Sequence, residues 1–185
     1  MRLFIAVHFP ADVLADLNAR VASLRPRLPS ASWVKEGSQH VTLAFLGEQP
    51  ESLAETLAPA LQVGLRDIPR FEARLHGCGF FPNQRRARVG WIGIEPEAPF
   101  VRMAAAVRAS VTTHGIALDA AEFRPHLTLM RIRDAWPPAS IELFSKSLRD
   151  YASTPFPVDA VTLFASQLDP KGAIHTPLRT FGLGK

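Results

Sequence analysis

The chain has 185 residues, of which 47% are hydrophobic and 21% charged, a composition typical of a soluble globular protein rather than a disordered one. No run of about 18 apolar residues occurs, so the sequence predicts no membrane partner, and the single cysteine, Cys78, excludes an internal disulfide. The net charge is +4, with arginine supplying 17 of the 21 cationic residues, a side chain suited to bidentate phosphate contacts. We expect one domain over residues 1–185 and a cytoplasmic location.

Strands and helices alternate along the first half of the chain. Hydrophobic periodicity, together with proline and glycine breaks, predicts the type and bounds of each element. In chain order these are a strand over residues 2–8, a helix over 10–25, strands over 33–34 and 40–46, a helix over 51–65, and strands over 71–80 and 87–95. The second half predicts a helix over 98–114, a strand over 124–132, a helix over 138–150, and strands over 156–166 and 173–181.

Two of these strands carry the same motif, His-Val-Thr-Leu at 40–43 and His-Leu-Thr-Leu at 126–129. Strand alternation puts His40 and Thr42 on one face, and His126 and Thr128 on one face of the other strand. One copy alone would be typical of a half-buried histidine. Two copies in matching strands indicate acid–base chemistry on a phosphate, because imidazoles titrate near neutrality and hydroxyls can bind the non-bridging oxygens.

The repeat of motif strand, helix and strand pair predicts an internal duplication. We therefore expect an α+β fold with two pseudo-symmetric lobes, each an antiparallel sheet with helices packed outside. A pseudo-two-fold axis between the lobes would bring the motif strands side by side and direct both histidines into one active-site groove.

Other phosphate chemistries lack their signatures. The sequence has no Walker loop, no Gly-x-Gly-x-x-Gly turn and no cluster with metal-ligand spacing. A zinc site built on His40 and His126 lacks a third ligand. The remaining interpretation is phosphoryl transfer that uses no metal and no cofactor.

The motifs and their flanks resemble the 2H phosphoesterase superfamily, specifically the RNA 2′,3′-cyclic phosphodiesterases, also called the LigT-like or 2′-5′ RNA ligase family. The resemblance covers nearly the whole chain. It includes Arg-Leu-Phe-Ile-Ala-Val at the start, Gln-His-Val-Thr-Leu-Ala-Phe-Leu-Gly-Glu at 39–48, Arg-Val-Gly-Trp-Ile-Gly-Ile at 88–94, Phe-Arg-Pro-His-Leu-Thr-Leu-Met-Arg at 123–131, and Leu-Phe-Ala-Ser at 163–166.

This resemblance implies an enzyme that hydrolyses the 2′,3′-cyclic phosphate end of RNA to a 2′-phosphate, and we expect it to be a monomer. It also implies 2′-5′ RNA ligation in reverse. His40 would be the general acid and His126 the general base, although the near-symmetric motifs leave that order open. Thr42 and Thr128 would hold the phosphate. Two alternatives remain: a 2H hydrolase for a small cyclic nucleotide, and a non-catalytic module that binds RNA ends.

Arg124 and Arg131 are the candidate substrate-binding residues. Arg124 lies on the motif face, whereas strict alternation from His126 points Arg131 away from the groove unless a bulge intervenes. His175 stands where many relatives have Tyr, so the sequence leaves open whether an aromatic contact persists there. We expect packing roles for the larger aromatic side chains, and a packed polar role for His8. These aromatic residues are Phe9, Trp33, Phe45 and Phe81.

Overall fold

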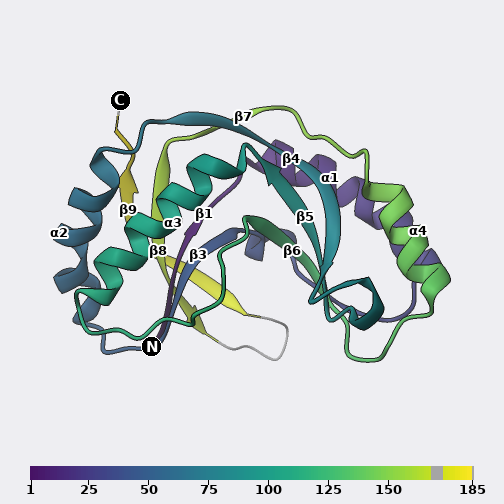
Figure 1. Cartoon of the computed structure of the whole chain (residues 1–185), viewed down its shortest axis with the longest axis horizontal. Coiled ribbons are helices and arrows are strands. Elements are labelled where there is room, and N and C mark those ends of the chain that lie inside the picture. Colours follow the sequence, from purple (N-terminus) through teal and green to yellow (C-terminus); the bar gives the residue numbers. More distant parts are fainter. Residues whose placement is uncertain (168–172, 185) are drawn as a thin grey trace.

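The computed structural model describes residues 1–167 and 173–184, and it contains two antiparallel sheets (Figure 1). A four-stranded sheet has the order β3-β1-β8-β9, and a five-stranded sheet has the order β2-β6-β5-β4-β7. The strands are β1 (Arg2–Val7), β2 (Ser32–Trp33), β3 (Val41–Glu48), β4 (Phe71–Phe81), β5 (Val89–Glu95), β6 (His126–Arg131), β7 (Phe156–Val158), β8 (Ala160–Gln167) and β9 (Ile174–Gly182).

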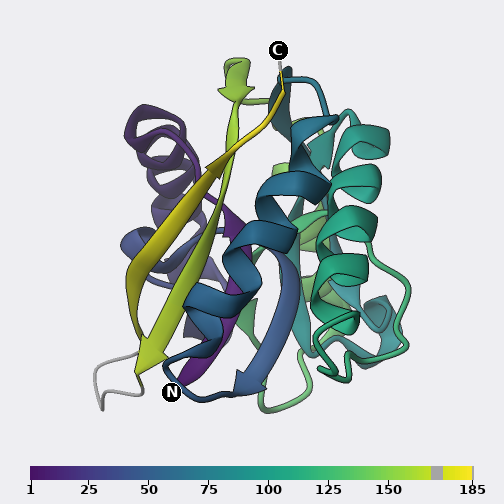
Figure 2. The ribbon, with the colours of Figure 1, turned by 90° about the vertical axis from the view of Figure 1, so that its left-hand side faces the viewer.

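Four α-helices lie outside the sheets in the described part of the chain. Helices α2 (Leu53–Arg66) and α3 (Glu97–Thr112) contact each other and cover the four-stranded sheet, as Figure 2 shows. Helix α4 (Pro138–Leu148) packs on β4, and α1 (Ala11–Leu24) lies beside α4, where Arg20 donates to the backbone carbonyl of Ser147. The predicted α+β class, with antiparallel sheets and helices packed outside, is confirmed. No described helix is long and apolar enough to cross a membrane.

The predicted repeat of motif strand, helix and strand pair is present, as β3-α2-β4-β5 and, with β7 inserted, as β6-α4-β8-β9. Strand pairing defines an equivalent unit of strand, helix, motif strand and second helix: β1-α1-β3-α2 in one copy and β5-α3-β6-α4 in the other. Each motif strand pairs with the first strand of its own unit, because β3 pairs with β1 and β6 pairs with β5. The first helix of each unit crosses to the other sheet. The two copies are therefore interlocked rather than forming two lobes of continuous sequence.

Two further predictions need correction. The strand predicted over 156–166 is divided at Asp159 into β7 and β8, which belong to different sheets, because the chain crosses from one sheet to the other at this point. The motif strands contact each other, but they do so from different sheets and are not hydrogen-bonded neighbours.

The motif strands share an irregularity that decides which side chains reach the groove. Leu43 in β3 and Leu129 in β6 are extra residues without a partner in the register of the neighbouring strand. Such a bulge restarts the alternation of side chains. After two buried residues in each strand, Phe45 and Arg131 emerge on the exposed side.

The main hydrophobic core lies between the sheets and the helices. A second, small cluster consists of Phe4, Ala6 and Phe164, on the face of the four-stranded sheet opposite that core. Since β1 and β8 pair at these positions, the cluster forms a rigid apolar floor. Both imidazoles and hydroxyls of the motifs lie around the cavity above this floor.

Candidate active site

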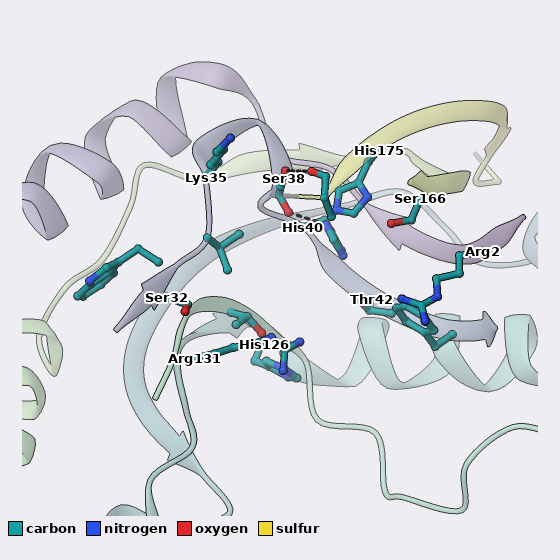
Figure 3. Close-up of a pocket in the computed structure, with 15 residues that line it drawn as sticks. Arg2, Ser32, Lys35, Ser38, His40, Thr42, His126, Arg131, Ser166 and His175 are labelled. Carbon is teal, nitrogen blue, oxygen red and sulfur yellow. Dashed lines mark hydrogen bonds between the residues drawn. The ribbon is translucent and has the colours of Figure 1, made fainter. Parts of the chain in front are cut away.

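A cavity of about 570 Å³ lies between the two sheets, and all four motif side chains line it. His40 directly precedes β3 and Thr42 lies near its start, whereas His126 and Thr128 belong to β6. Figure 3 shows the two imidazoles reaching this cavity from opposite sides. The structure thus brings together the four residues that the sequence predicts as catalytic.

Both imidazoles are oriented in the same way by the backbone. The Nδ1 atom of His40 lies 2.9 Å from the carbonyl oxygen of Ser38, and that of His126 lies 2.7 Å from the carbonyl oxygen of Arg124. A carbonyl oxygen can only accept, so each Nδ1 carries the proton and donates it. In the neutral ring, Nε2 is then left as the basic nitrogen. Each histidine is prepared to take up or release a proton at Nε2.

Aromatic rings fix the plane of each imidazole. His40 stacks on Phe4, with ring centroids 4.7 Å apart and an angle of 29° between the planes. Phe4 is itself buried and stacks on Phe164 in the floor cluster. On the other side, the ring of His126 meets Phe81 edge to face at 4.8 Å. The two rings are therefore held by contacts within their respective sheets.

The surroundings favour neutral imidazoles in the free protein. Burial lowers the pKa of His40 to about 4, and the nearby His175, His8 and His126 contribute to that lowering by repulsion. Burial also lowers the pKa of His126, and the positive charge of Arg131 acts in the same direction. Both directions follow from the cost of placing a cation in a poorly solvated site beside other positive groups.

The cavity carries positive charge suited to a phosphate. Arg2, Lys35 and Arg131 line it, and within the described chain no acidic side chain does so. Arg2 forms an ion pair with Glu48, which lies outside the lining, at 3.2 Å. Among the described residues there is also no group of three or more His, Cys, Asp or Glu side chains arranged to hold a metal ion. The chemistry that the arrangement offers is acid–base catalysis on an anion.

The two candidate arginines lie in different places. Arg131 lines the cavity because the bulge at Leu129 restores its orientation, which strict alternation would reverse. Arg124 does not line this cavity; its exposed side chain pairs with Glu122 at 3.3 Å. Its contribution to the cavity is the backbone carbonyl that holds His126.

Several lining residues were missed or assigned to packing from the sequence. Phe45 is 55% exposed and lines the cavity, as does Trp33, so packing alone does not describe either side chain. His175, whose contact the sequence leaves open, also lines the cavity, with its ring centroid 5.3 Å from that of His40. Phe45 occupies the same place in its motif strand as Arg131, five residues after the histidine, but only the bulge in the structure shows that this place faces the cavity. Phe9, in contrast, is a core residue as predicted.

The model of the 2′-5′ RNA ligase superfamily matches residues 10–170. The chain belongs to this superfamily. The membership confirms the resemblance seen in the two motifs and their flanks. A relative in Thermus thermophilus, named RNA 2′,3′-cyclic phosphodiesterase, is 35% identical, and the match covers 99% of this chain and 90% of that protein. A relative of the same name in Escherichia coli is 32% identical over 98% of this chain and 96% of its own length.

Solved structures show the same fold as this chain. A crystal structure of a Thermus thermophilus protein matches 100% of both chains with a TM-score of 0.79 and 34% identity. A crystal structure of Escherichia coli LigT complexed with 3′-AMP matches with a TM-score of 0.73 and 25% identity, covering 100% of this chain and 98% of that one.

Proposed function

We propose that the protein hydrolyses the terminal 2′,3′-cyclic phosphate of RNA to a 2′-phosphate, without a metal ion. The observation that carries this proposal is the pair of imidazoles, each anchored at Nδ1, on opposite sides of one cationic cavity. Hydrolysis of a cyclic phosphate is also the activity in the names of the Thermus thermophilus and Escherichia coli relatives.

The reaction needs one proton removed and one supplied. His126 takes a proton from water at Nε2, and the water oxygen attacks phosphorus. As the bond from phosphorus to O3′ breaks, His40 gives its Nε2 proton to O3′. The hydroxyls of Thr42 and Thr128 donate to the non-bridging oxygens, where charge accumulates, and Arg131 stabilises the same charge.

Substrate binding enables His40 to take up from solvent the proton that it must later give to O3′. The free protein keeps this imidazole neutral because burial and three nearby histidines lower its pKa to about 4. An anionic phosphate beside Nε2 stabilises the imidazolium and raises that pKa. His40 is therefore charged mainly in the complex, where the proton is needed.

The terminal nucleobase stacks on Phe45. This ring is exposed, lines the cavity on the His40 side, and lies nearly parallel to Phe4, with centroids 5.9 Å apart and an angle of 13°. Base–aromatic stacking is typical of proteins that bind single-stranded RNA and depends little on sequence. Phe45 would thus hold an end nucleotide of any base, while Arg2 and Lys35 attract the RNA backbone.

An oligonucleotide ending in a 2′,3′-cyclic phosphate tests the proposal. We expect the 2′-phosphate as product; a 3′-phosphate would show that O2′, not O3′, is the leaving group. His40→Ala and His126→Ala should each lower kcat at least about a hundredfold, because each removes a proton-transfer group. Near-normal kcat in either variant would exclude the role assigned to the substituted histidine. The control is His114→Ala, because His114 is exposed and lies just after α3.

Binding and metal dependence separate this proposal from its alternatives. The His40→Ala and His126→Ala variants should still bind the cyclic end, because binding does not require proton transfer. If the wild-type protein binds the cyclic end but does not hydrolyse it, the chain is instead a module that binds RNA ends. EDTA should leave turnover intact. Turnover of small cyclic nucleotides but not of the oligonucleotide would favour the small-molecule hydrolase.

A further inference from the structure

A row of three polar side chains crosses the four-stranded sheet at the edge of the catalytic cavity. Arg2 of β1 pairs with Ser166 of β8, and Ser166 pairs with His175 of β9. Directly opposed residues of antiparallel strands have Cβ atoms about 4.5–5.5 Å apart, so the three side chains form one short line. All three line the cavity, and Figure 3 shows them on the same side of it as His40. The hydrolysis mechanism assigns no role to Ser166 or His175.

This row lies beside the place of the reacting phosphate without coinciding with it. Phe4, on which His40 stacks, follows Arg2 by two residues in β1, about 7 Å along the strand. His175 connects the row with the imidazole, because its ring centroid is 5.3 Å from that of His40. A ligand group bound to the row is therefore separated from the reacting phosphorus by a short distance, which a ribose can span.

Arg2 can supply a bidentate contact to an anion. Its Nε atom pairs with a carboxylate oxygen of Glu48 at 3.2 Å, and both side chains of this pair are exposed. An exposed ion pair contributes little free energy, so it does not prevent the guanidinium from turning to a ligand. The two Nη nitrogens are further donors, in the planar fork that matches two oxygens of a phosphate.

Ser166 and His175 add two donors without adding charge. Ser166 is only 9% exposed, so water competes little for its hydroxyl. The Nδ1 atom of His175 is buried without a hydrogen-bond partner, so Nε2 is the ring nitrogen that can donate to a ligand. Burial also lowers the pKa of His175 and keeps the ring neutral. One cation and two neutral donors fit a singly charged phosphodiester.

An RNA end carries such a phosphodiester at the matching place. The end nucleotide holds the cyclic phosphate on O2′ and O3′, and it is joined to the rest of the strand through a phosphate on O5′. One ribose separates the two phosphates. Phe45, on which the base is proposed to stack, pairs with Phe4, one row from Arg2. The base, the cyclic phosphate and the 5′-phosphate of one nucleotide would thus occupy three neighbouring places.

We propose that Arg2, Ser166 and His175 form a binding site for the 5′-phosphodiester of the end nucleotide, through which the protein selects RNA strands over free nucleoside 2′,3′-cyclic phosphates. The inference rests on the proposed function and names the substrate class that the site selects. The 5′-phosphodiester stays intact in the reaction. Its contacts are therefore the same in the ground state and the transition state, and they lower KM more than they raise kcat.

Four substrates isolate the charge on O5′. Adenosine 2′,3′-cyclic monophosphate has a free 5′-hydroxyl, and its 5′-phosphorylated form adds a phosphate alone. A diadenosine dinucleotide with a 2′,3′-cyclic end adds the phosphodiester and a second nucleoside. The same dinucleotide with a methylphosphonate linkage keeps the second nucleoside without the charge. We expect kcat/KM to be at least about tenfold higher for the two substrates with the charge, mainly through KM.

Three variants test the row itself. The measured quantity is the ratio of kcat/KM for the charged dinucleotide to kcat/KM for adenosine 2′,3′-cyclic monophosphate. Arg2→Gln should lower this ratio at least about tenfold, and Ser166→Ala and His175→Phe about threefold each. Any effect of His175→Phe on His40 cancels in the ratio, because His40 acts on both substrates.

Two matched controls lie in the same sheet outside the cavity. Arg179→Gln removes an arginine of β9 that pairs with Glu55 at 3.3 Å, as Arg2 pairs with Glu48. Thr162→Ala removes a hydroxyl of β8, the strand of Ser166. Both variants should keep the wild-type ratio.

Three results would overturn the inference and leave the proposed function standing. The first is an equal kcat/KM for adenosine 2′,3′-cyclic monophosphate and its 5′-phosphorylated form. The second is a full preference for the methylphosphonate dinucleotide, which would show that the second nucleoside is bound and not the phosphate. The third is an unchanged ratio in all three variants. Absence of hydrolysis of all four substrates would overturn the proposed function itself.

Discussion

Each imidazole of the site is oriented by the backbone two residues before it, and this contact is short-range. The carbonyls of Ser38 and Arg124 fix the proton on Nδ1 without any other side chain. The same offset in both motifs explains why the repeated His-x-Thr pattern can predict the chemistry. His175 is different, because it comes from β9 and reaches His40 only through the pairing of β9 with β8. The sequence pattern around it gives no signal of that contact.

His175→Phe should raise the pKa of His40. The substitution keeps an aromatic ring against Phe4 but removes a group whose positive charge lowers the pKa of His40. Because the proposed acid must be protonated, the basic limb of the pH profile of kcat/KM should move to higher pH. NMR titration of the His40 ring measures the pKa directly. His8→Phe should give a smaller change in the same direction, since its ring is farther away, at 6.4 Å; an unmoved His40 titration in His175→Phe would contradict this account.

At the scale of the elements, alternation along β3 and β6 predicts which side chains face the groove only as far as the bulge in each strand. Period-two alternation places His40, Thr42, His126 and Thr128 correctly, because all four precede the extra residue. It fails beyond Leu43 and Leu129, where the register with the neighbouring strand shifts. Register depends on the partner strand, which a single motif does not contain. Arg131 and Phe45 therefore required the structure.

The close packing of Gly79 in β4 against the Trp91 indole leads to a prediction about stability. In Gly79→Ala, the new methyl group would meet the indole at 2.3 Å, so the ring must move from the sheet. We expect a loss of about 1–3 kcal/mol in the free energy of unfolding, typical of overpacking. Chemical denaturation measures the loss. Gly182→Ala, in β9 with no atom within 4 Å of its added Cβ, should retain wild-type stability; equal stability of both variants would contradict the packing argument.

At the scale of the whole molecule, the duplication could be predicted from the sequence. The sheet to which each strand and helix of a copy belongs could not. The spacing of the motifs indicates two copies, and the predicted elements have nearly the observed bounds except for the strand over 156–166, which is divided into β7 and β8. The sequence does not show that α1 and α3 each cross to the other sheet, because sheet membership depends on contacts between distant segments. This crossing interlocks the copies, so both imidazoles depend on one continuous core. Catalytic geometry and global stability are consequently coupled.

Acid should destabilise the fold through the same histidines that line the groove. The pKa of His8, His40, His126 and His175 is lowered in each case chiefly by burial. Between the folded and unfolded pKa, the unfolded chain binds protons that the folded one does not. Stability is thus complete above about pH 6.5 and falls as the pH approaches about 4, with His40 alone contributing at most about 3 kcal/mol.

Guanidinium denaturation at about pH 5 and pH 7.5 measures this effect, since most carboxylates stay ionised in that window. The free energy of unfolding should be lower at the acidic end, and His40→Gln should reduce the difference because its side chain does not titrate. A phosphate bound in the cavity should reduce it as well, by stabilising the protonated ring in the folded state. The same pH dependence in His40→Gln and in the wild-type protein would show that burial of this imidazole is not its source.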